Sequence, residues 1–104
     1  MVHGKVKLYN EEENIEAILG YKEGLRSGDY IFYFPNGNIK ERGAFKNNKL
    51  QGLIETYNEN KELVATAEYV EGNFKSGKCS NGKSIFSEDV KRDNFNIHTF
   101  CSYN

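Results

Sequence analysis

The strongest constraint on this chain is a pattern that recurs every 24 residues through most of its length. Four columns of glycine, aromatic and aliphatic positions stay in register over three copies. The columns are Gly4, Gly28 and Gly52; Tyr9, Tyr33 and Tyr57; Ile15, Ile39 and Leu63; and Tyr21, Phe45 and Tyr69. A fixed period of this size predicts a small structural unit that stacks on its own copies. The units are expected at residues 4–27, 28–51 and 52–76, followed by a partial copy at 77–87 and a divergent cap at 88–104.

Each unit has the features of a β-hairpin. Its second half alternates like a strand with one buried face, as at Ala17, Leu19 and Tyr21. The middle unit places Asn36-Gly37 between its two apolar runs, which is a strong hairpin signal. Because no connection is long enough for a crossover helix, successive strands must be antiparallel. The sequence therefore predicts an all-β fold, a single domain over residues 1–104 that forms an antiparallel meander of stacked β-hairpin repeats, with about eight strands.

Individual segments predict finer details of the sheet. Residues 30–34 form an unbroken apolar run, which is typical of a strand covered on both faces. Aromatic residues that recur once per unit are expected to join neighbouring units in the core, and this applies to both the Tyr9 and the Tyr21 columns. The turns at 10–14 and 58–61 lack the glycine of the middle turn and are expected to be looser.

The end of the chain departs from the repeat. Residues 84–87 are expected to form a short return strand, residues 88–94 a helical turn, and residues 96–103 an edge strand that caps the array. The N-terminus carries no secretory signal, so the chain is expected to be cytoplasmic and Cys79 and Cys101 to be free thiols. A bridge between these two cysteines is left open by the sequence.

The charge balance narrows the class of partner. Fourteen Lys and Arg residues stand against fifteen Asp and Glu residues, which leaves a net charge of −1. Direct binding to nucleic acid or to an anionic membrane needs a basic field, so neither is expected. No apolar run approaches the roughly 20 residues of a membrane helix. A protein partner would have to be recognised by local shape and local charge.

The repeat resembles a known family. The residues that carry the resemblance are Tyr33, Asn36-Gly37, Phe45 and Gly52 in the middle copy, and Tyr57, Tyr69 and Gly77 in the next. This pattern is similar to the variant MORN repeat of bacterial antitoxin-like proteins, over about residues 4–82. The first copy departs from it, with Glu12-Glu13 in place of Asn-Gly, and the tail lies outside it.

The resemblance implies a single-layer or half-wrapped sheet of stacked hairpins. It also implies an immunity protein or antitoxin that binds a cognate toxin domain, possibly a nuclease, and blocks its active site. The alternative is a structural scaffold or a membrane-peripheral interaction module, as classical MORN arrays are in eukaryotes.

Catalytic and metal-binding chemistry find little support in the residue types. The chain has two histidines, His3 and His98, and the one close pair of reactive residues is His98 with Cys101. On a strand, residues three apart face opposite sides, so these two are not expected to meet. We therefore expect no enzyme, no metal site and no cofactor. An enzyme would need a pocket that brings His98 to a carboxylate.

Acidic residues gather near the first turn. Residues 11–23 contain five Glu and a single Lys, whereas Lys and Arg outnumber acidic residues from residue 72 onward. Such clusters commonly do no more than keep a surface solvated. The functional interpretation is a patch that docks onto a basic active site, such as one that binds nucleic-acid phosphates. The residues expected to contact the partner are Glu11, Glu12, Glu13 and Glu16.

Overall fold

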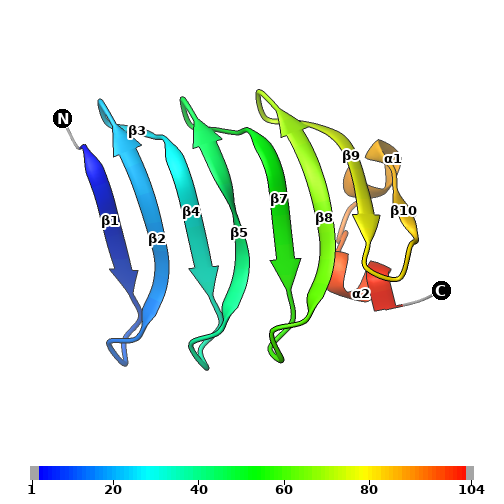
Figure 1. The fold of residues 1–104 in the computed structure, drawn as a ribbon, viewed down its shortest axis with the longest axis horizontal. Coiled ribbons are helices and arrows are strands. Elements are labelled where there is room, and N and C mark those ends of the chain that lie inside the picture. Colours follow the sequence, from blue (N-terminus) through cyan, green and yellow to red (C-terminus); the bar gives the residue numbers. More distant parts are fainter. Residues whose placement is uncertain (1–2, 103–104) are drawn as a thin grey trace.

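The computed structural model describes residues 3–102, in which ten strands form one antiparallel sheet (Figure 1). The main path runs β1-β2-β4-β5-β7-β8-β9-β10, while β3 pairs with β2 and β6 with β5. The strands are β1 (Gly4–Tyr9), β2 (Ile15–Lys22), β3 (Leu25–Arg26), β4 (Gly28–Tyr33), β5 (Ile39–Lys46), β6 (Lys49–Leu50), β7 (Gly52–Tyr57), β8 (Leu63–Val70), β9 (Asn73–Cys79) and β10 (Ser84–Ile85). Sheet order follows chain order, so the predicted all-β hairpin meander is confirmed.

The face of the sheet that carries the core, here called the inner face, is built by alternate residues of neighbouring strands. Leu19, Tyr30 and Ile54 form a buried cluster on it. The side chains packed around this cluster are Tyr21, Phe32, Phe45, Leu50 and Tyr69. The column that contains Tyr21, Phe45 and Tyr69 therefore joins neighbouring hairpins, as predicted.

Gly43 makes room for the largest buried side chain of the core. It lies opposite Tyr30 in the β4–β5 ladder. A Cβ atom at this position would collide with the Ile54 side chain and would come within 3.0 Å of the Tyr30 ring. The absence of a side chain at this position therefore lets Tyr30 cross the inner face of β5.

The Tyr9, Tyr33 and Tyr57 column lies on the opposite, outer face. A bulge follows Leu8, Phe32 and Thr56 in the three hairpins, at the same repeat position each time. Leu8 pairs with inner-face Ala17, so the next residue, Tyr9, points outward and is 56% exposed. The prediction that this column packs in the core was wrong, because one step along a strand changes the face.

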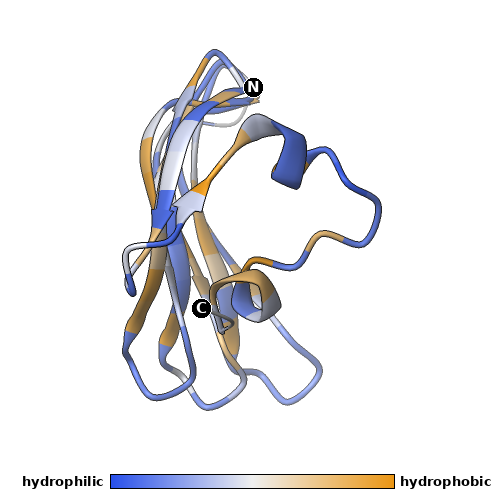
Figure 2. Cartoon of the chain, turned by 90° about the vertical axis from the view of Figure 1, so that its right-hand side faces the viewer, coloured by the Kyte–Doolittle hydropathy of each residue, from blue (hydrophilic) through white to orange (hydrophobic). Residues whose placement is uncertain are grey.

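Both helices lie on one side of the sheet (Figure 2). Helix α1 comprises Ser87–Val90 and helix α2 Ile97–Ser102, and α2 packs against β8. Within residues 3–102 no second layer covers the outer face, where Ile31 and Tyr33 of β4 are half-buried. The expectation that residues 30–34 are covered on both faces was therefore wrong. Neither helix among the described residues is long and apolar enough to span a bilayer.

The tail folds differently from its prediction. The return strand exists as β10, and α1 supplies the helical turn near the expected place, but residues 97–102 are helical and not an edge strand. Asn96 caps α2, since its side-chain oxygen accepts a hydrogen bond from the backbone N–H of Thr99 at 3.1 Å. Residue 103, the last of the expected edge strand, lies outside the described residues.

A disulfide between Cys79 and Cys101 ties α2 to the end of β9. Their Cα atoms are 5.4 Å apart, and no free cysteine remains in the described chain. The prediction of two free thiols was wrong. Its cause is the tail: as a helix, the chain turns back over the inner face and brings Cys101 to Cys79.

The turns at the lower end of the hairpins in Figure 1 share one geometry. In each, the first backbone N–H donates to the carbonyl four residues further on, at 2.8–2.9 Å; the donors are Asn10, Phe34, Asn58 and Cys79. Gly37 and Gly82 adopt positive φ at equivalent positions, and so do Glu13 (65°) and Lys61 (69°). The turns without glycine are therefore closed as tightly as the others, contrary to expectation, but with strained residues.

The ladder between neighbouring hairpins is split at the first two junctions, whereas β8 and β9 pair over six residues with a single register shift. Strand β2 pairs with β3 through Tyr21 and Lys22, and with β4 through Ala17 and Ile18. Between these two short ladders the Ser27 N–H donates to the Gly20 carbonyl at 2.8 Å, and the equivalent Gln51 N–H donates to Ala44. The first three hairpins thus meet along interrupted seams, whereas the strands within each of them pair over six residues with a single bulge.

Candidate functional site

The four predicted partner-binding residues lie together at one corner of the sheet. Glu11, Glu12 and Glu13 form the turn between β1 and β2, Glu16 follows on β2, and all four are exposed. The side-chain oxygen of Asn10 accepts hydrogen bonds from the backbone N–H groups of Glu12 and Asn14, at 2.9 and 3.0 Å. This local network holds the acidic turn in one conformation, so its carboxylates are presented from a defined backbone.

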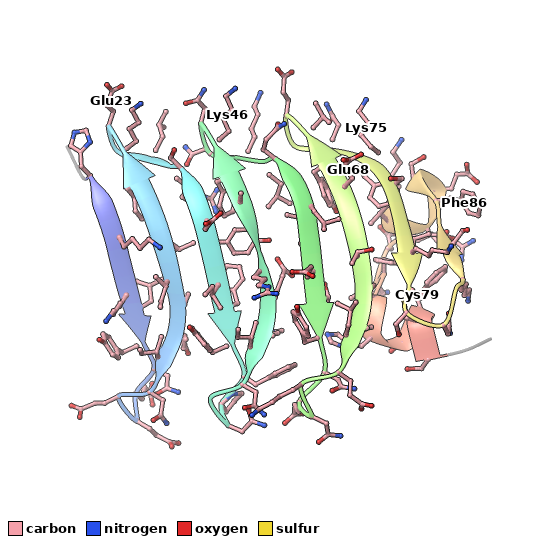
Figure 3. All side chains as sticks on the ribbon, in the orientation of Figure 1. Glu23, Lys46, Glu68, Lys75, Cys79 and Phe86 are labelled. Atoms are coloured by element: carbon pink, nitrogen blue, oxygen red, sulfur yellow. A yellow bond between two sulfur atoms is a disulfide. The ribbon has the colours of Figure 1, made fainter. Side chains whose placement is uncertain are left out.

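The repeat extends this acidic corner along one rim. We call the turns at residues 10–16, 34–40 and 58–62 the lower rim, and those at 22–27, 46–51 and 70–75 the upper rim (Figure 1). The lower rim carries Glu11, Glu12, Glu13, Glu16, Glu59 and Glu62 against Lys40 and Lys61. The upper rim carries Lys22, Arg26, Lys46, Lys49 and Lys75 against Glu23 and Glu71, three of which Figure 3 labels at that edge.

This separation of charge by rim was not expected from the sequence, in which the acidic and basic regions seemed to follow one another along the chain. It arises because each repeat has one turn on the lower rim and one on the upper rim. Residues of one charge sign that are far apart in sequence therefore share a rim.

The pair His98 and Cys101 is arranged differently from its prediction. Both lie on α2, where residues three apart share a face. Cys101 is bound in the disulfide, so it offers no thiol nucleophile. The His98 ring lies 6.4 Å from the ring of Phe34. Among the described residues, no group of three or more His, Cys, Asp or Glu side chains could hold a metal ion.

The inner face carries a polar cluster that sequence reasoning missed. We define the inner-face cluster as Tyr30, Glu41, Thr56 and Tyr69. The Tyr30 hydroxyl donates a hydrogen bond to Oε2 of Glu41 at 2.6 Å. Thr56, which is buried, lies directly across from Glu41 in the β5–β7 ladder. Four adjacent strands, β4, β5, β7 and β8, therefore bring polar groups together in an otherwise apolar face.

The cluster consists largely of departures from the repeat. Glu41 stands where the other two copies have alanine, and Tyr30 and Thr56 also replace purely apolar residues. The equivalent residues are Ala17 and Ala65 for Glu41, Val6 and Ile54 for Tyr30, and Leu8 and Phe32 for Thr56. Comparing the copies column by column for polar replacements would have found this cluster.

The two tyrosines of the cluster are perturbed by their surroundings. Burial, and then the hydrogen bond to Glu41, raise the pKa of Tyr30. Burial, and then the charge of Glu41, raise the pKa of Tyr69. Both hydroxyls therefore remain protonated at neutral pH and can act as hydrogen-bond donors.

A cavity of about 290 Å³ adjoins this cluster, between the sheet and the C-terminal helices. Its polar lining comes from Glu41, Thr56 and Tyr69. Its apolar lining consists of Leu50, Ile54, Ala67, Phe74, Ile85, Val90, Phe95 and Ile97. Because four of these residues follow β9, the cavity could not be foreseen while the tail was expected to be an edge strand.

Comparison with known proteins identifies one repeat. Residues 26–47 match the family model of the MORN repeat variant, and they span β4 and β5, the second hairpin. No curated protein and no solved structure matches the chain. The hairpins on either side have the same turns and bulges as the matched one. The chain thus contains a MORN repeat variant within an array of like hairpins, which suggests a protein-interaction or scaffold module.

Proposed function

We propose that this chain is a non-catalytic binding module of the immunity-protein or antitoxin type, which docks through the lower rim onto a basic site of a toxin domain. The observation that carries the proposal is the gathering of six glutamates in or next to turns along one rim of the array. Complementary charge speeds association and orients the partners, while the bulk of the sheet would block access to the site. A nuclease toxin, whose active site must attract phosphates, would present such a basic surface.

The geometry of the turns supports this role. Side-chain oxygens of Asn10 and Asn58 each accept two backbone hydrogen bonds within their turns. Asn36 and Asn38 of the second turn donate to the Glu59 carbonyl in the third, at 3.2 and 2.8 Å. The first and third turns are thereby each held internally, and the second turn is tied to the third. Fixed turns lose little conformational entropy on binding, which favours a docking surface.

The test asks whether this chain protects cells against its toxin. The candidate toxin is the product of the gene next to the one that encodes this chain. That product should inhibit growth when expressed alone, and co-expression of this chain should restore growth. A variant with Glu11→Gln, Glu12→Gln, Glu13→Gln and Glu16→Gln should bind the product more slowly and protect less. The matched control is Glu23→Gln, Glu68→Gln, Glu71→Gln and Glu88→Gln, which changes the net charge equally at exposed positions outside the lower rim.

Two results would count against the proposal. If the chain fails to protect against a toxic neighbour, the antitoxin role is wrong for that pair. If the lower-rim variant binds with the same on-rate and salt dependence as the control, docking through this rim is wrong.

A membrane-peripheral module is the second candidate, and the basic upper rim favours it. Its five cations, at Lys22, Arg26, Lys46, Lys49 and Lys75, face one edge of the sheet. Anionic lipid attracts such groups at roughly 1 kcal/mol each. Sedimentation with phosphatidylserine vesicles, compared with neutral phosphatidylcholine vesicles, separates the two candidates, because the antitoxin proposal requires no lipid binding.

The cytoplasmic location remains a prediction, and the disulfide counts against it. Disulfides persist mainly in oxidising compartments. Trapping thiols with an alkylating agent at the moment of cell lysis would show whether Cys79 and Cys101 are bridged where the protein resides. Alkylation of both residues would favour the cytosol.

A further inference from the structure

We propose that the cavity beneath the C-terminal helices binds a primary ammonium group on a short apolar stem, with Glu41 as its counter-ion. The site is separate from the lower rim and does not depend on the proposed function. The same chemistry is offered by a free alkylamine and by a lysine side chain of another protein.

Comparison of Glu41 with the equivalent residues of the other repeats indicates that it is more than a packing residue. At the equivalent position the other copies have Ala17 and Ala65, which are 2% and 1% exposed, so the hairpin folds without a carboxylate there. A ligand that fills the cavity removes water from the partly buried carboxylate, and this desolvation costs free energy unless the ligand brings a cation that offsets it. Within residues 3–102 the carboxylate of Glu41 forms no ion pair; the two ion pairs of this region are Arg42 with Glu55 and Arg92 with Asp89. A cationic ligand would supply the missing charge.

The hydrogen bond from Tyr30 selects the kind of cation. It occupies Oε2 of Glu41 at 2.6 Å. A guanidinium group prefers to engage both carboxylate oxygens side by side, so it would have to share Oε2 with the Tyr30 hydroxyl. An ammonium group is a compact charge with three donors, so it can bind the remaining oxygen and also the Thr56 hydroxyl across the ladder.

Aromatic rings form the next part of the wall. The rings of Tyr69 and Phe74 stand edge to face, with centroids 5.7 Å apart, and both residues line the cavity. A ring face toward an ammonium group adds cation–π attraction. Glu41 and Tyr69 are only partly buried, so a ligand can reach them from solvent.

The apolar remainder of the cavity sets the length of the stem. Ile85, Val90 and Ile97 line it from the C-terminal part of the chain. A volume of about 290 Å³ lies at the small end of ligand sites, which run from roughly 300 to 1,000 Å³. It suits one unbranched alkyl chain and excludes a bulky ligand.

The experiment titrates the protein with n-pentylamine and follows backbone amide signals by NMR. The largest shifts are expected at Glu41, Thr56 and Tyr69, with little change in the acidic turn. The neutral n-pentanol and the guanidinium analogue pentylguanidine should bind at least about tenfold more weakly, which corresponds to the loss of one charge-assisted hydrogen bond.

Two variants test the role of Glu41. Glu41→Gln keeps the shape of the side chain, and Glu41→Ala installs the residue of the equivalent positions; both should weaken pentylamine binding at least about tenfold. Glu68→Gln, on an exposed side chain, is the control and should bind as the unmodified protein does. Thermal unfolding monitored by circular dichroism shows whether each variant is folded, and Glu41→Ala keeps the proposal testable if Glu41→Gln does not fold.

A second arm distinguishes the source of the ammonium group. A tripeptide with a central lysine and blocked ends is titrated in the same way. Binding of the peptide in preference to pentylamine identifies a partner's lysine, and the reverse identifies a small amine. The proposal is overturned if neither probe shifts the cluster, if pentanol binds as tightly as pentylamine, or if both Glu41 variants keep the original affinity.

Discussion

Some turn residues of the repeat have a left-handed backbone conformation, which lowers the stability of the fold. Glu13 and Lys61 hold positive φ where Gly37 and Gly82 stand in the other turns. For residues with a side chain this conformation costs roughly 1–2 kcal/mol. Glycine avoids this strain, but it offsets part of the gain because it loses more conformational entropy on folding. The first and third turns are therefore positions where stability can be gained.

Lys61→Gly should raise the free energy of unfolding by up to about 1 kcal/mol, because it removes the strain at φ 69°. The reverse change, Gly37→Lys, is its matched partner in the second turn and should lower stability by a similar amount. Urea denaturation followed by circular dichroism measures both. A loss of stability in Lys61→Gly would show that the lysine side chain contributes more than the strain costs.

The tyrosines of the inner-face cluster make stability sensitive to alkaline pH. The folded-state pKa of Tyr30 and of Tyr69 is raised by burial, with Glu41 as the second cause. Below about pH 10 both states keep these protons, so the stabilisation is fully present. Above it the unfolded chain releases protons that the folded chain retains, so the free energy of unfolding falls as pH rises.

Tyr30→Phe should flatten this alkaline decline, while lowering stability at neutral pH because Glu41 loses its hydrogen-bond donor. Urea midpoints at about pH 8 and about pH 11 measure the slope, on either side of the ordinary tyrosine value. Tyr9→Phe, which alters an exposed ring on the outer face, is the control. An equally steep decline in Tyr30→Phe and in the unmodified protein would contradict the assignment.

At the scale of elements, the hairpins were predictable and the tail was not. The hairpins rest on local signals, such as Asn36-Gly37 and the alternation along residues 39–45, that recur three times. The bulges escaped detection because an extra residue, such as Lys40 on β5, leaves no mark in composition, yet it decides which face Ile39 shares with Tyr33. Helix α2 depends on contacts that are distant in sequence, above all on the Cys79–Cys101 bridge. Residue types near residues 97–102 cannot reveal such contacts.

The disulfide should stabilise the C-terminal cap but not the sheet. It joins residues 22 apart in sequence, and closing a loop of this size stabilises a fold by about 3 kcal/mol in the chain-entropy model. Cys101→Ser should therefore speed hydrogen exchange throughout residues 87–102 and leave residues 4–57 protected. Ser80→Ala, next to the bridged Cys79, is the control. Unchanged exchange in the cap of Cys101→Ser would show that packing of α2 on β8 suffices alone.

The whole molecule is an array in which each hairpin pairs along the sheet with its neighbours in the chain. Strands β1, β4 and β7 begin with Gly4, Gly28 and Gly52, and each pairs with the following long strand over six residue pairs. Column comparison predicted this architecture, and the same comparison locates Glu41 as an exception within it. The cavity beside Glu41 is a property of the whole molecule, since it needs both the middle hairpins and the folded-back tail.

Duplication of residues 28–51 should extend the array by one hairpin and keep it folded, because the copied unit meets the same neighbours on both sides. Far-ultraviolet circular dichroism should report more strand, and the thermal midpoint should not fall. An aggregated or unfolded product would mean that the cap and the first hairpin depend on contacts beyond their neighbours. A 23-residue insertion, which breaks the period by one position, is the matched control and should disrupt the fold.

The split ladders between the first three hairpins have a mechanical consequence. Bending stress on the sheet concentrates at the interruptions near Ser27 and Gln51, where few hydrogen bonds resist it, while each hairpin stays stiff. Flexing there changes the curvature of the sheet and so the spacing between successive turns of a rim. One array can in this way conform to surfaces of different radius without reshaping any single turn.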